Sequence, residues 1–429
     1  MKIKYILAFT WCFIAFAEQS KATESSVESE NKWTIIHAGT LLAVPGDKVR
    51  KQQTIIIKNN KIEKLVNGYV DFEPENKTKA KLIDLKNSFV MPGLIDMHVH
   101  LDLNGPDWTK SNNKDASEAY RIFKAQVNAA KTLQAGYTTV RNPGGSGWAV
   151  FALRKAIENG VVSGPRIFLS GHTISVGGGD GSGTCSGPES CRKAVRKQID
   201  MGADFIKVYA TCSGSKPCGH GDARPVFLED ELKAVIATAK TRQLKVAAHG
   251  HAVAGINQAL SLGADSIEHG TFSDEKSIAL FKKTGAFLVP TIAVQDNVIR
   301  DSKTATDSKM LHVMHNAIES HPKSVRNAYK AGVKIAAGSD AGVIKHGDNA
   351  NELLWYVNKV GMTTQDALIA TTINAAELLG MEEKIGKIDP QMFADIVAFS
   401  ASPLDDINEI KNVVFVMKDG KVEVSNANN

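Results

Sequence analysis

"MPGLIDMHVHLD", residues 91–102, is an apolar run that ends in two histidines one residue apart. Side chains alternate between the two faces of a β-strand, so His98 and His100 point to the same face. Two imidazoles on one face can hold a metal ion, but they can also be buried histidines satisfied by hydrogen bonds. The pair alone supports both interpretations, and the rest of the chain is needed to choose between them.

The chain beyond this stretch repeats one unit: a helix pattern, a turn with glycine and a short apolar strand. The unit recurs from Leu133 to Asp340, for example in LSLGADSIEHG at 260–270 and YKAGVKIAAGSD at 329–340. Near-continuous apolar strands are typical of a parallel sheet buried on both faces, and strands that alternate with helices indicate βα units. The predicted strands are 94–100, 138–142, 166–171, 205–210, 244–249, 266–270, 287–291 and 333–340.

Eight such units predict an α/β protein with a (β/α)8 TIM barrel, which we place at residues 91–384. A doubly wound open sheet is the alternative, but the first βα turn lacks the Gly-rich fingerprint that binds phosphate. The flanking segments, 33–90 and 385–425, contain short strands separated by turns such as KNNK (58–61) and KDGK (418–421). We expect these N- and C-terminal segments to combine into one small β-sandwich beside the barrel.

The first residues have the layout of a secretory signal peptide, which we place at 1–22. Lys2 and Lys4 precede an apolar stretch from Tyr5 to Ala17, and small residues follow as possible cleavage sites. An uncleaved membrane anchor is the alternative, but the apolar run is shorter than the roughly 20 residues that a span needs. The sequence therefore predicts a periplasmic or secreted protein that has no membrane contact after cleavage.

Composition sets further limits on the partners. The chain is 43% apolar and 23% charged, as soluble globular proteins are. Its net charge of +5 over 429 residues is too weak to indicate a nucleic-acid partner. A homo-oligomer stays open, because no surface pattern in the sequence establishes one.

Four cysteines remain after the predicted signal: Cys185, Cys191, Cys212 and Cys218. An even number in an exported protein indicates disulfides. Pairing within each C-x5-C segment is the simplest of the three possible connectivities. A zinc site is the alternative, although the C-x2-C spacing of structural zinc sites is absent.

Polar side chains stand at the ends of several predicted strands. In a barrel of this kind the active site lies at the C-terminal ends of the strands, so these side chains are expected to converge. The candidate metal ligands are His98, His100, Lys207, His249, His269 and Asp340. Any one of the histidines alone fits a core residue, but the set at matching positions of successive units favours a metal site.

At this point the chain resembles the amidohydrolase superfamily. The motifs that carry the resemblance are PGLIDMHVH, GYTTVRN, IKVYA, SIEHGT and AGSDAG, and ADIVAF resembles the returning strand of that family. The resemblance spans about residues 33–425. It is strongest to the imidazolonepropionase-related branch, which includes peptidases acting on Xaa-Pro dipeptides and N-acyl amino acids, and it extends to secreted ochratoxin-hydrolysing amidohydrolases.

The resemblance implies a site with two divalent metal ions. In such a site Lys207 would be carboxylated by CO2, and each oxygen of the resulting carbamate would bind one ion. The other ligands would divide between the ions, with His98, His100 and Asp340 on one and His249 and His269 on the other. Zinc suits the nitrogen-rich set, and manganese and cobalt stay open. Asp340 would also act as general base and then general acid.

Other polar residues near the strand ends are candidates for substrate contacts. Tyr209 and His251 are expected to assist catalysis, because each stands two residues beyond a predicted ligand and shares its face. The candidates for holding the substrate are Arg141, His172, His220 and Arg224. An arginine in this position could bind a carboxylate with two hydrogen bonds.

The sequence therefore predicts an exported binuclear hydrolase that cleaves an amide or peptide bond with water activated by the metal ions. The expected small-molecule substrate is a dipeptide or an N-acyl amino acid with a free carboxylate. The alternatives are a cyclic amide hydrolase or deaminase, an organophosphate or lactone hydrolase, and a non-catalytic binding protein on the same fold. The fold alone does not choose among them.

Overall fold

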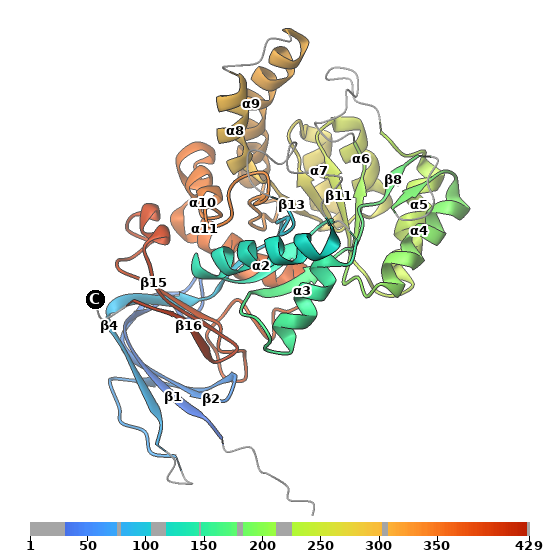
Figure 1. The fold of residues 1–429 in the computed structure, drawn as a ribbon. Coiled ribbons are helices and arrows are strands. Elements are labelled where there is room, and N and C mark those ends of the chain that lie inside the picture. The colour runs from blue at the N-terminus through green and yellow to red at the C-terminus, as the bar shows by residue number, and fades with distance from the viewer. Residues whose placement is uncertain are drawn as a thin grey trace, which may run out of the picture. The chain divides into compact units, whose positions relative to one another are not determined.

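The computed structural model of the chain describes residues 31–74, 79–103, 117–145, 147–177, 183–211, 225–302 and 308–426, with the side chains at 298, 301–302 and 308–314 excepted. The predicted signal peptide at 1–22 lies outside the described residues. Figure 1 shows the arrangement of the helices and strands. In the part of the chain that is described, no helix combines the length and the apolar character that crossing a membrane requires.

The centre of the fold is a ring of parallel strands. Its members are β5 (Leu94–Asp96), β6 (Tyr137–Asn142), β7 (Arg166–Leu169), β10 (Ile206–Tyr209), β11 (Val246–Gly250), β12 (Ser266–His269) and β13 (Phe287–Val289). They form two parallel sheets, β5-β6-β7 and β10-β11-β12-β13. Every residue of β6, β11 and β12 is buried, as expected for strands covered on both faces.

Two irregular segments close the ring between these sheets. On one side the backbone of Ile174 pairs with β10, donating to Lys207 O at 2.8 Å and accepting from Tyr209 N at 3.0 Å. On the other side, residues 335–341 take the place of the predicted eighth strand. They pair with Leu288 of β13 and with Val99, but they form only isolated bridges.

The predicted eighth strand is irregular because of its composition at the cavity end. Gly338 passes so close to His98 that an added Cβ would lie 2.9 Å from the His98 Cβ. Asp340 then takes a left-handed backbone conformation with φ of 57°, which a regular strand does not contain. The closed parallel barrel that the repeated unit predicts is confirmed, and this strand is the exception to its regularity.

Helices follow the strands and cover the ring (Figure 1). They are α2 (Glu118–Gln134), α3 (Ala149–Glu158), α4 (Pro188–Asp200), α5 (Glu229–Lys240), α6 (Val253–Leu262), α7 (Glu275–Thr284), α8 (Gln295–Ser302), α9 (Ser308–Lys330), α10 (Asn351–Trp355), α11 (Thr364–Ala370) and α12 (Ile373–Leu379). Shorter helical turns are η2 (Ile292–Val294), η3 (Tyr356–Val360) and η4 (Ile407–Lys411). Left-handed glycines end several helices, as Gly263 does for α6 and Gly285 for α7.

The N- and C-terminal segments form one β-sheet. Its strands are β1 (Trp33–Leu41), β2 (Arg50–Lys58), β3 (Lys61–Asn67), β4 (Lys81–Pro92), β14 (Ile396–Phe399), β15 (Val413–Lys418) and β16 (Lys421–Ser425), in the order β16-β15-β14-β4-β1-β2-β3. A single core cluster contains Ile36 and Ile55 from one half together with Phe415 and Met417 from the other. Strand β4 therefore joins the N- and C-terminal halves into one continuous sheet. The sheet has a hydrophobic core of its own, as expected for the predicted sandwich.

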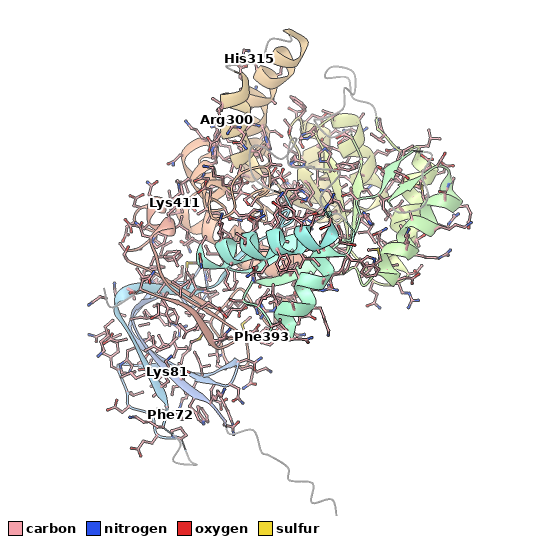
Figure 2. All side chains as sticks on the ribbon, in the orientation of Figure 1. Phe72, Lys81, Arg300, His315, Phe393 and Lys411 are labelled. Atoms are coloured by element: carbon pink, nitrogen blue, oxygen red, sulfur yellow. A yellow bond between two sulfur atoms is a disulfide. The ribbon has the colours of Figure 1, made fainter. Side chains whose placement is uncertain are left out.

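Figure 2 shows the side chains on this frame. Phe72 and Lys81 lie by the terminal sheet, whereas Arg300 and His315 lie on α8 and α9 (Figure 2). A two-residue strand pair, β8 (Ser175–Val176) and β9 (Thr184–Cys185), borders the cavity described next.

Candidate active site

A cavity of about 560 Å³ opens at the C-terminal ends of the barrel strands. All of the candidate metal ligands line it, namely His98, His100, Lys207, His249, His269 and Asp340. Three of the proposed substrate contacts line it as well: Tyr209, His251 and His172. The parallel strands bring these residues together from distant parts of the sequence, as the repeated unit predicts.

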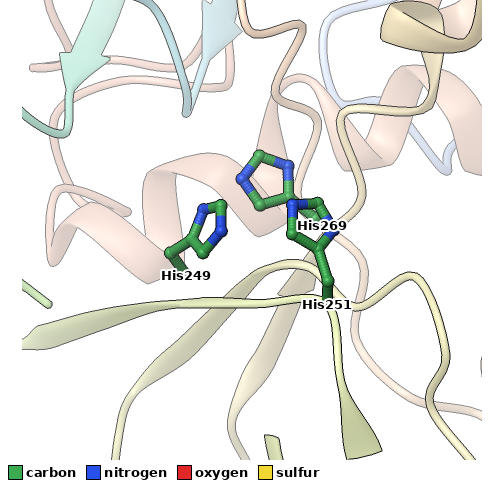
Figure 3. Close-up of side chains that lie close together, drawn as sticks. All are labelled: His249, His251 and His269. Atoms are coloured by element: carbon green, nitrogen blue, oxygen red, sulfur yellow. The ribbon is translucent and has the colours of Figure 1, made fainter. Parts of the chain in front are cut away.

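Two groups of ligand atoms lie close enough to bind metal ions. One nitrogen each of His249, His251 and His269 lie within 4.8 Å of one another (Figure 3), and so do ligand atoms of His98, His269 and Asp340. His269 belongs to both groups. His251 therefore lies nearer to the candidate ligands than expected, with its ring stacked on that of His269 at 4.7 Å.

Asp340 lies between His98 and His100, which follow β5. Its Oδ1 is 3.4 Å from His100 Nε2 and 3.7 Å from His98 Nε2. Asp340 and His269 both have left-handed backbones, with φ of 57° and 72°. Such conformations are uncommon for residues other than glycine, and they concentrate at functional sites.

Hydrogen bonds at Nδ1 set the orientation of three imidazoles. His98 Nδ1 lies 2.7 Å from a carboxylate oxygen of Glu268, and His100 Nδ1 lies 3.2 Å from the carbonyl oxygen of Gly144. A carbonyl oxygen only accepts, so His100 Nδ1 is the donor in this contact. His269 Nδ1 contacts the Thr291 hydroxyl at 2.6 Å. This arrangement leaves Nε2 atoms to face the cavity, as metal-binding histidines require.

Three histidines in the cavity, His98, His251 and His269, are neutral at pH 7 because burial lowers the pKa of each. Burial, assisted by the charge of Lys207, lowers the pKa of His98 to about 4. Burial also lowers the pKa of His251 to about 4 and that of His269 well below its ordinary value. Neutral imidazoles have the lone pairs that a divalent cation needs.

Lys207 Nζ and Asp340 Oδ1 are buried in the cavity and make no hydrogen bond with any described residue. Lys207 is only 2% exposed, and burial lowers its pKa to about 8. An unpartnered carboxylate oxygen among neutral imidazoles is a donor set that fits zinc and similar divalent ions. The residues present therefore fit a metal centre.

Arg141 does not take the position expected for it. Its side chain is 3% exposed and donates to Glu268 Oε1 at 2.6 Å and to Met97 O at 2.7 Å. The guanidinium lies inside the barrel and does not line the cavity, so the prediction that it binds substrate is corrected. His220 and Arg224 lie outside the described residues.

Several residues that support the site were not found from the sequence. Glu268 is buried, and burial alone would raise its pKa, but Arg141 and Lys207 hold that pKa well below its usual range. Asp96 accepts from the backbone N–H groups of His98 and Ser339, both at 3.0 Å, and so ties the first strand to the irregular eighth segment. The sequence signal that could have identified Glu268 is its position as a charged residue inside the apolar strand SIEHG.

The helical insert after β13 contributes one histidine to this support. His321 of α9 is buried and its Nε2 lies 2.9 Å from the carbonyl oxygen of His269. This histidine therefore packs inside the protein behind His269. His315 on the same helix is exposed (Figure 2), and the side chain of His312 is outside the described set.

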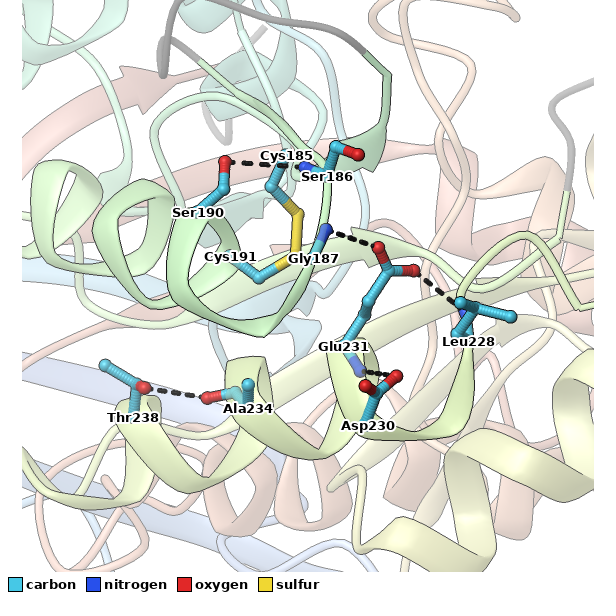
Figure 4. Close-up of a disulfide and its surroundings, with 10 residues drawn as sticks. All are labelled: Cys185, Ser186, Gly187, Ser190, Cys191, Leu228, Asp230, Glu231, Ala234 and Thr238. Carbon is cyan, nitrogen blue, oxygen red and sulfur yellow. Dashed lines mark hydrogen bonds between the residues drawn. A yellow bond between two sulfur atoms is a disulfide. The ribbon is translucent and has the colours of Figure 1, made fainter.

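A disulfide joins Cys185 of β9 to Cys191 of α4 (Figure 4), with the Cα atoms 4.9 Å apart. The local pairing predicted for this pair is confirmed, and the zinc alternative for it is excluded. Thr184, which precedes Cys185, lines the cavity. Glu231 accepts from Gly187 N at 2.7 Å and from Leu228 N at 2.9 Å, which ties the start of α4 to the start of α5. Cys212 and Cys218 lie outside the described residues.

Known proteins resemble this chain in both sequence and structure. The amidohydrolase family profile matches residues 89–422. Ochratoxinase of Aspergillus niger is 31% identical, over 92% of this chain and 87% of that protein. The crystal structure of a Xaa-Pro dipeptidase with bound methionine is similar with a TM-score of 0.80 and 34% identity, covering 91% of this chain and 99% of that one. A prolidase complexed with N-methylphosphonate-L-proline is similar with a TM-score of 0.82 and 27% identity, over the same shares of the two chains.

The profile match extends through the barrel and into the terminal sheet, and the cavity carries histidine clusters that fit the metal ions typical of the family. Sequence, fold and site agree that this chain belongs to the amidohydrolase family.

Proposed function

We propose that this protein is a binuclear metal hydrolase that cleaves the amide bond of a dipeptide or an N-acyl amino acid with a free carboxylate. Support comes from the similarity to a Xaa-Pro dipeptidase and to ochratoxinase. The cavity volume of about 560 Å³ lies in the range of small-molecule sites.

The observation that carries the proposal is the buried amine of Lys207, which has no hydrogen-bond partner among the described residues. A buried ammonium ion without a partner is costly. Reaction of the neutral amine with CO2, with release of one proton, converts it into a carbamate anion with two oxygens. Lys207 would then supply one oxygen to each of two ions and balance part of their charge.

The remaining ligands would divide as the resemblance implies, with His98, His100 and Asp340 on one ion and His249 and His269 on the other. Zinc suits this set. Bound divalent ions would lower the pKa of a water molecule and polarise the scissile carbonyl.

The side chains of the chain move the protons and orient the substrate. Asp340 accepts a proton from the attacking water and delivers it to the leaving nitrogen. Tyr209 and His251 lie on the cavity wall and orient the substrate by hydrogen bonds. Neutral His251 contacts the Thr271 hydroxyl through Nδ1 at 2.8 Å, which leaves Nε2 for the substrate.

We also propose that the protein is exported. The charged and apolar pattern of residues 1–22 supports a signal peptide. The Cys185–Cys191 disulfide agrees with an oxidising compartment.

The proposal is tested by a substrate screen on metal-reconstituted protein. Metal-free protein is loaded with zinc, manganese or cobalt, with and without bicarbonate, and given dipeptides and N-acyl amino acids. Each substrate is paired with its C-terminal carboxamide as a control. We expect release of free amino acid, faster after loading with bicarbonate and much slower for the carboxamides. Hydrolysis confined to lactones, organophosphates or cyclic amides, or no hydrolysis with any metal, would contradict the proposal.

A further inference from the structure

Arg141 and Glu268 form a buried charged pair beneath the cavity that the proposed chemistry does not use. Arg141 Nη2 donates to Glu268 Oε1 at 2.6 Å, and neither residue is more than 3% exposed. Arg141 lies on β6 and Glu268 on β12, which stand on opposite sides of the ring. The pair therefore crosses the interior of the barrel.

Each oxygen of the Glu268 carboxylate has its own partners. Oε1 accepts from Arg141 and from the Ser266 hydroxyl, both at 2.6 Å. Oε2 lies 2.7 Å from His98 Nδ1. Arginine stays protonated in proteins, so the carboxylate paired with it is ionised. An ionised carboxylate accepts hydrogen bonds and does not donate them. His98 must therefore be the donor in the second contact.

Arg141 holds this carboxylate with a rigid set of donors. Its Nε donates to Met97 O at 2.7 Å, and its Nη1 donates to the Ser266 hydroxyl at 3.2 Å. One planar guanidinium thus fixes Glu268 relative to the backbone just before His98. Lysine has no such fork of donors and could not make all three contacts.

Stability alone is a weak reason for this arrangement, because a buried ion pair seldom stabilises more than apolar residues of similar volume would. Geometry points to another role. We propose that Arg141 and Glu268 are positioning residues that hold the His98 imidazole with its proton on Nδ1 and its Nε2 lone pair directed into the metal cavity. This inference rests on the proposed metal function of the cavity, and it assigns Arg141 a role in the metal centre in place of substrate binding.

Substitution Glu268→Gln tests the inference with almost no change in size. The amide oxygen takes the place of Oε1 and accepts from Arg141, so the amide NH2 faces His98 Nδ1. A donor at that position forces the ring proton to Nε2, where it blocks metal binding. We expect a 10- to 100-fold loss of affinity for one metal ion, the range seen when the partner of a ligating histidine is removed.

A milder change is Ser266→Ala, which removes one hydrogen bond to the same carboxylate and one contact of Arg141 but leaves the contact between Glu268 and His98 in place. This variant is expected to keep the His98 proton on Nδ1 and to lose less metal affinity than Glu268→Gln. Arg141→Lys retains the charge but loses the fork, and it is expected to bind more weakly than wild type and more tightly than Glu268→Gln.

The decisive readout is the tautomer of His98 in metal-free protein, measured by 15N NMR on histidine-labelled samples, with His98→Asn assigning the signal. We expect a proton on Nδ1 in wild type and on Nε2 in Glu268→Gln. A proton on Nε2 in wild type would overturn the inference even if a variant fails to fold, and so would equal metal affinity of wild type and Glu268→Gln. Protein that shows the expected tautomers and metal affinities but hydrolyses no amide would contradict the proposed function and leave this inference standing.

Discussion

At the scale of single residues, Asp340 offers the cleanest separation of binding from turnover. Its backbone is left-handed, and asparagine tolerates that conformation better than most residues. Asp340→Asn should therefore fold and retain much of the metal, while kcat falls about 10²- to 10⁴-fold because the group that transfers the proton is lost. Metal content and kcat are measured on the same preparation.

The control for this substitution is Asp340→Ala, which should lose more thermal stability because alanine is strained at this φ. Near-normal turnover by Asp340→Asn would show that the proton takes another route.

The sequence allowed the cavity residues to be predicted because equivalent positions of parallel strands meet at one end of a barrel. It did not show which way a side chain at a strand end points. Arg141 was expected at the rim for this reason, but a buried carboxylate on the opposite strand holds it inside. The role of Glu268 depends on a partner 170 residues away, and no local pattern reveals such a contact.

At the scale of elements, the disulfide between β9 and α4 supports the cavity wall beside Thr184. Replacing Cys185 and Cys191 by serine should lower the free energy of unfolding by about 2 kcal/mol, the value expected for a short closed loop. KM should rise while kcat changes less, because the wall shifts and the metal ligands do not.

Denaturant unfolding and steady-state kinetics measure these two effects. Ser190→Ala serves as the control, since it removes only a weak hydrogen bond in the same turn. An unchanged KM in the double cysteine variant would show that the wall does not depend on the disulfide.

Glu352 supports the turn at residues 291–293, which contacts the candidate ligand His269 through Thr291. It accepts from Ile292 N at 2.9 Å and from Ala293 N at 2.7 Å, beside the Thr291 hydroxyl that contacts His269. Burial raises the pKa of Glu352 from 4.5 to about 8, although these N–H groups lower it. The folded protein therefore keeps a proton here that the unfolded chain has released.

Glu352 contributes its full stabilisation below the pKa that it has in the unfolded chain. This stabilisation is lost as the pH rises towards the pKa that Glu352 has in the folded protein. Between about pH 5 and 8 the free energy of unfolding of wild type should fall as the pH rises. This fall should be steeper than that of Glu352→Gln by about 1.4 kcal/mol per pH unit. Urea unfolding of both proteins across this range measures the difference. Equal slopes would mean that Glu352 is ionised in the folded protein.

The elements themselves were predictable where the apolar period and glycine turns were strong. The eighth strand was not, because its irregularity comes from the close approach of Gly338 to His98, a contact between distant segments. The terminal strands were predicted as a sandwich, but strand length alone did not show that β4 would link both halves into one sheet.

At the scale of the whole molecule, metal ions that bind only the folded chain should stabilise it. At a free metal concentration 1,000 times Kd the gain is about 4 kcal/mol for one site. Removing the ions with a chelator should therefore lower Tm, and restoring them should raise it again, as measured by calorimetry. Lys207→Ala should show a smaller rise on metal addition, and an equal rise would mean that Lys207 does not bind the ions.

We propose that two metal ions share a carboxylated Lys207 at the mouth of the barrel. Crystals of protein loaded with zinc and bicarbonate test it most directly, through anomalous scattering at the metal edge. We expect two anomalous peaks per chain and electron density for a carbamate on Lys207. A single peak, together with an unmodified Lys207 amine directed away from it, would show that no such binuclear centre forms.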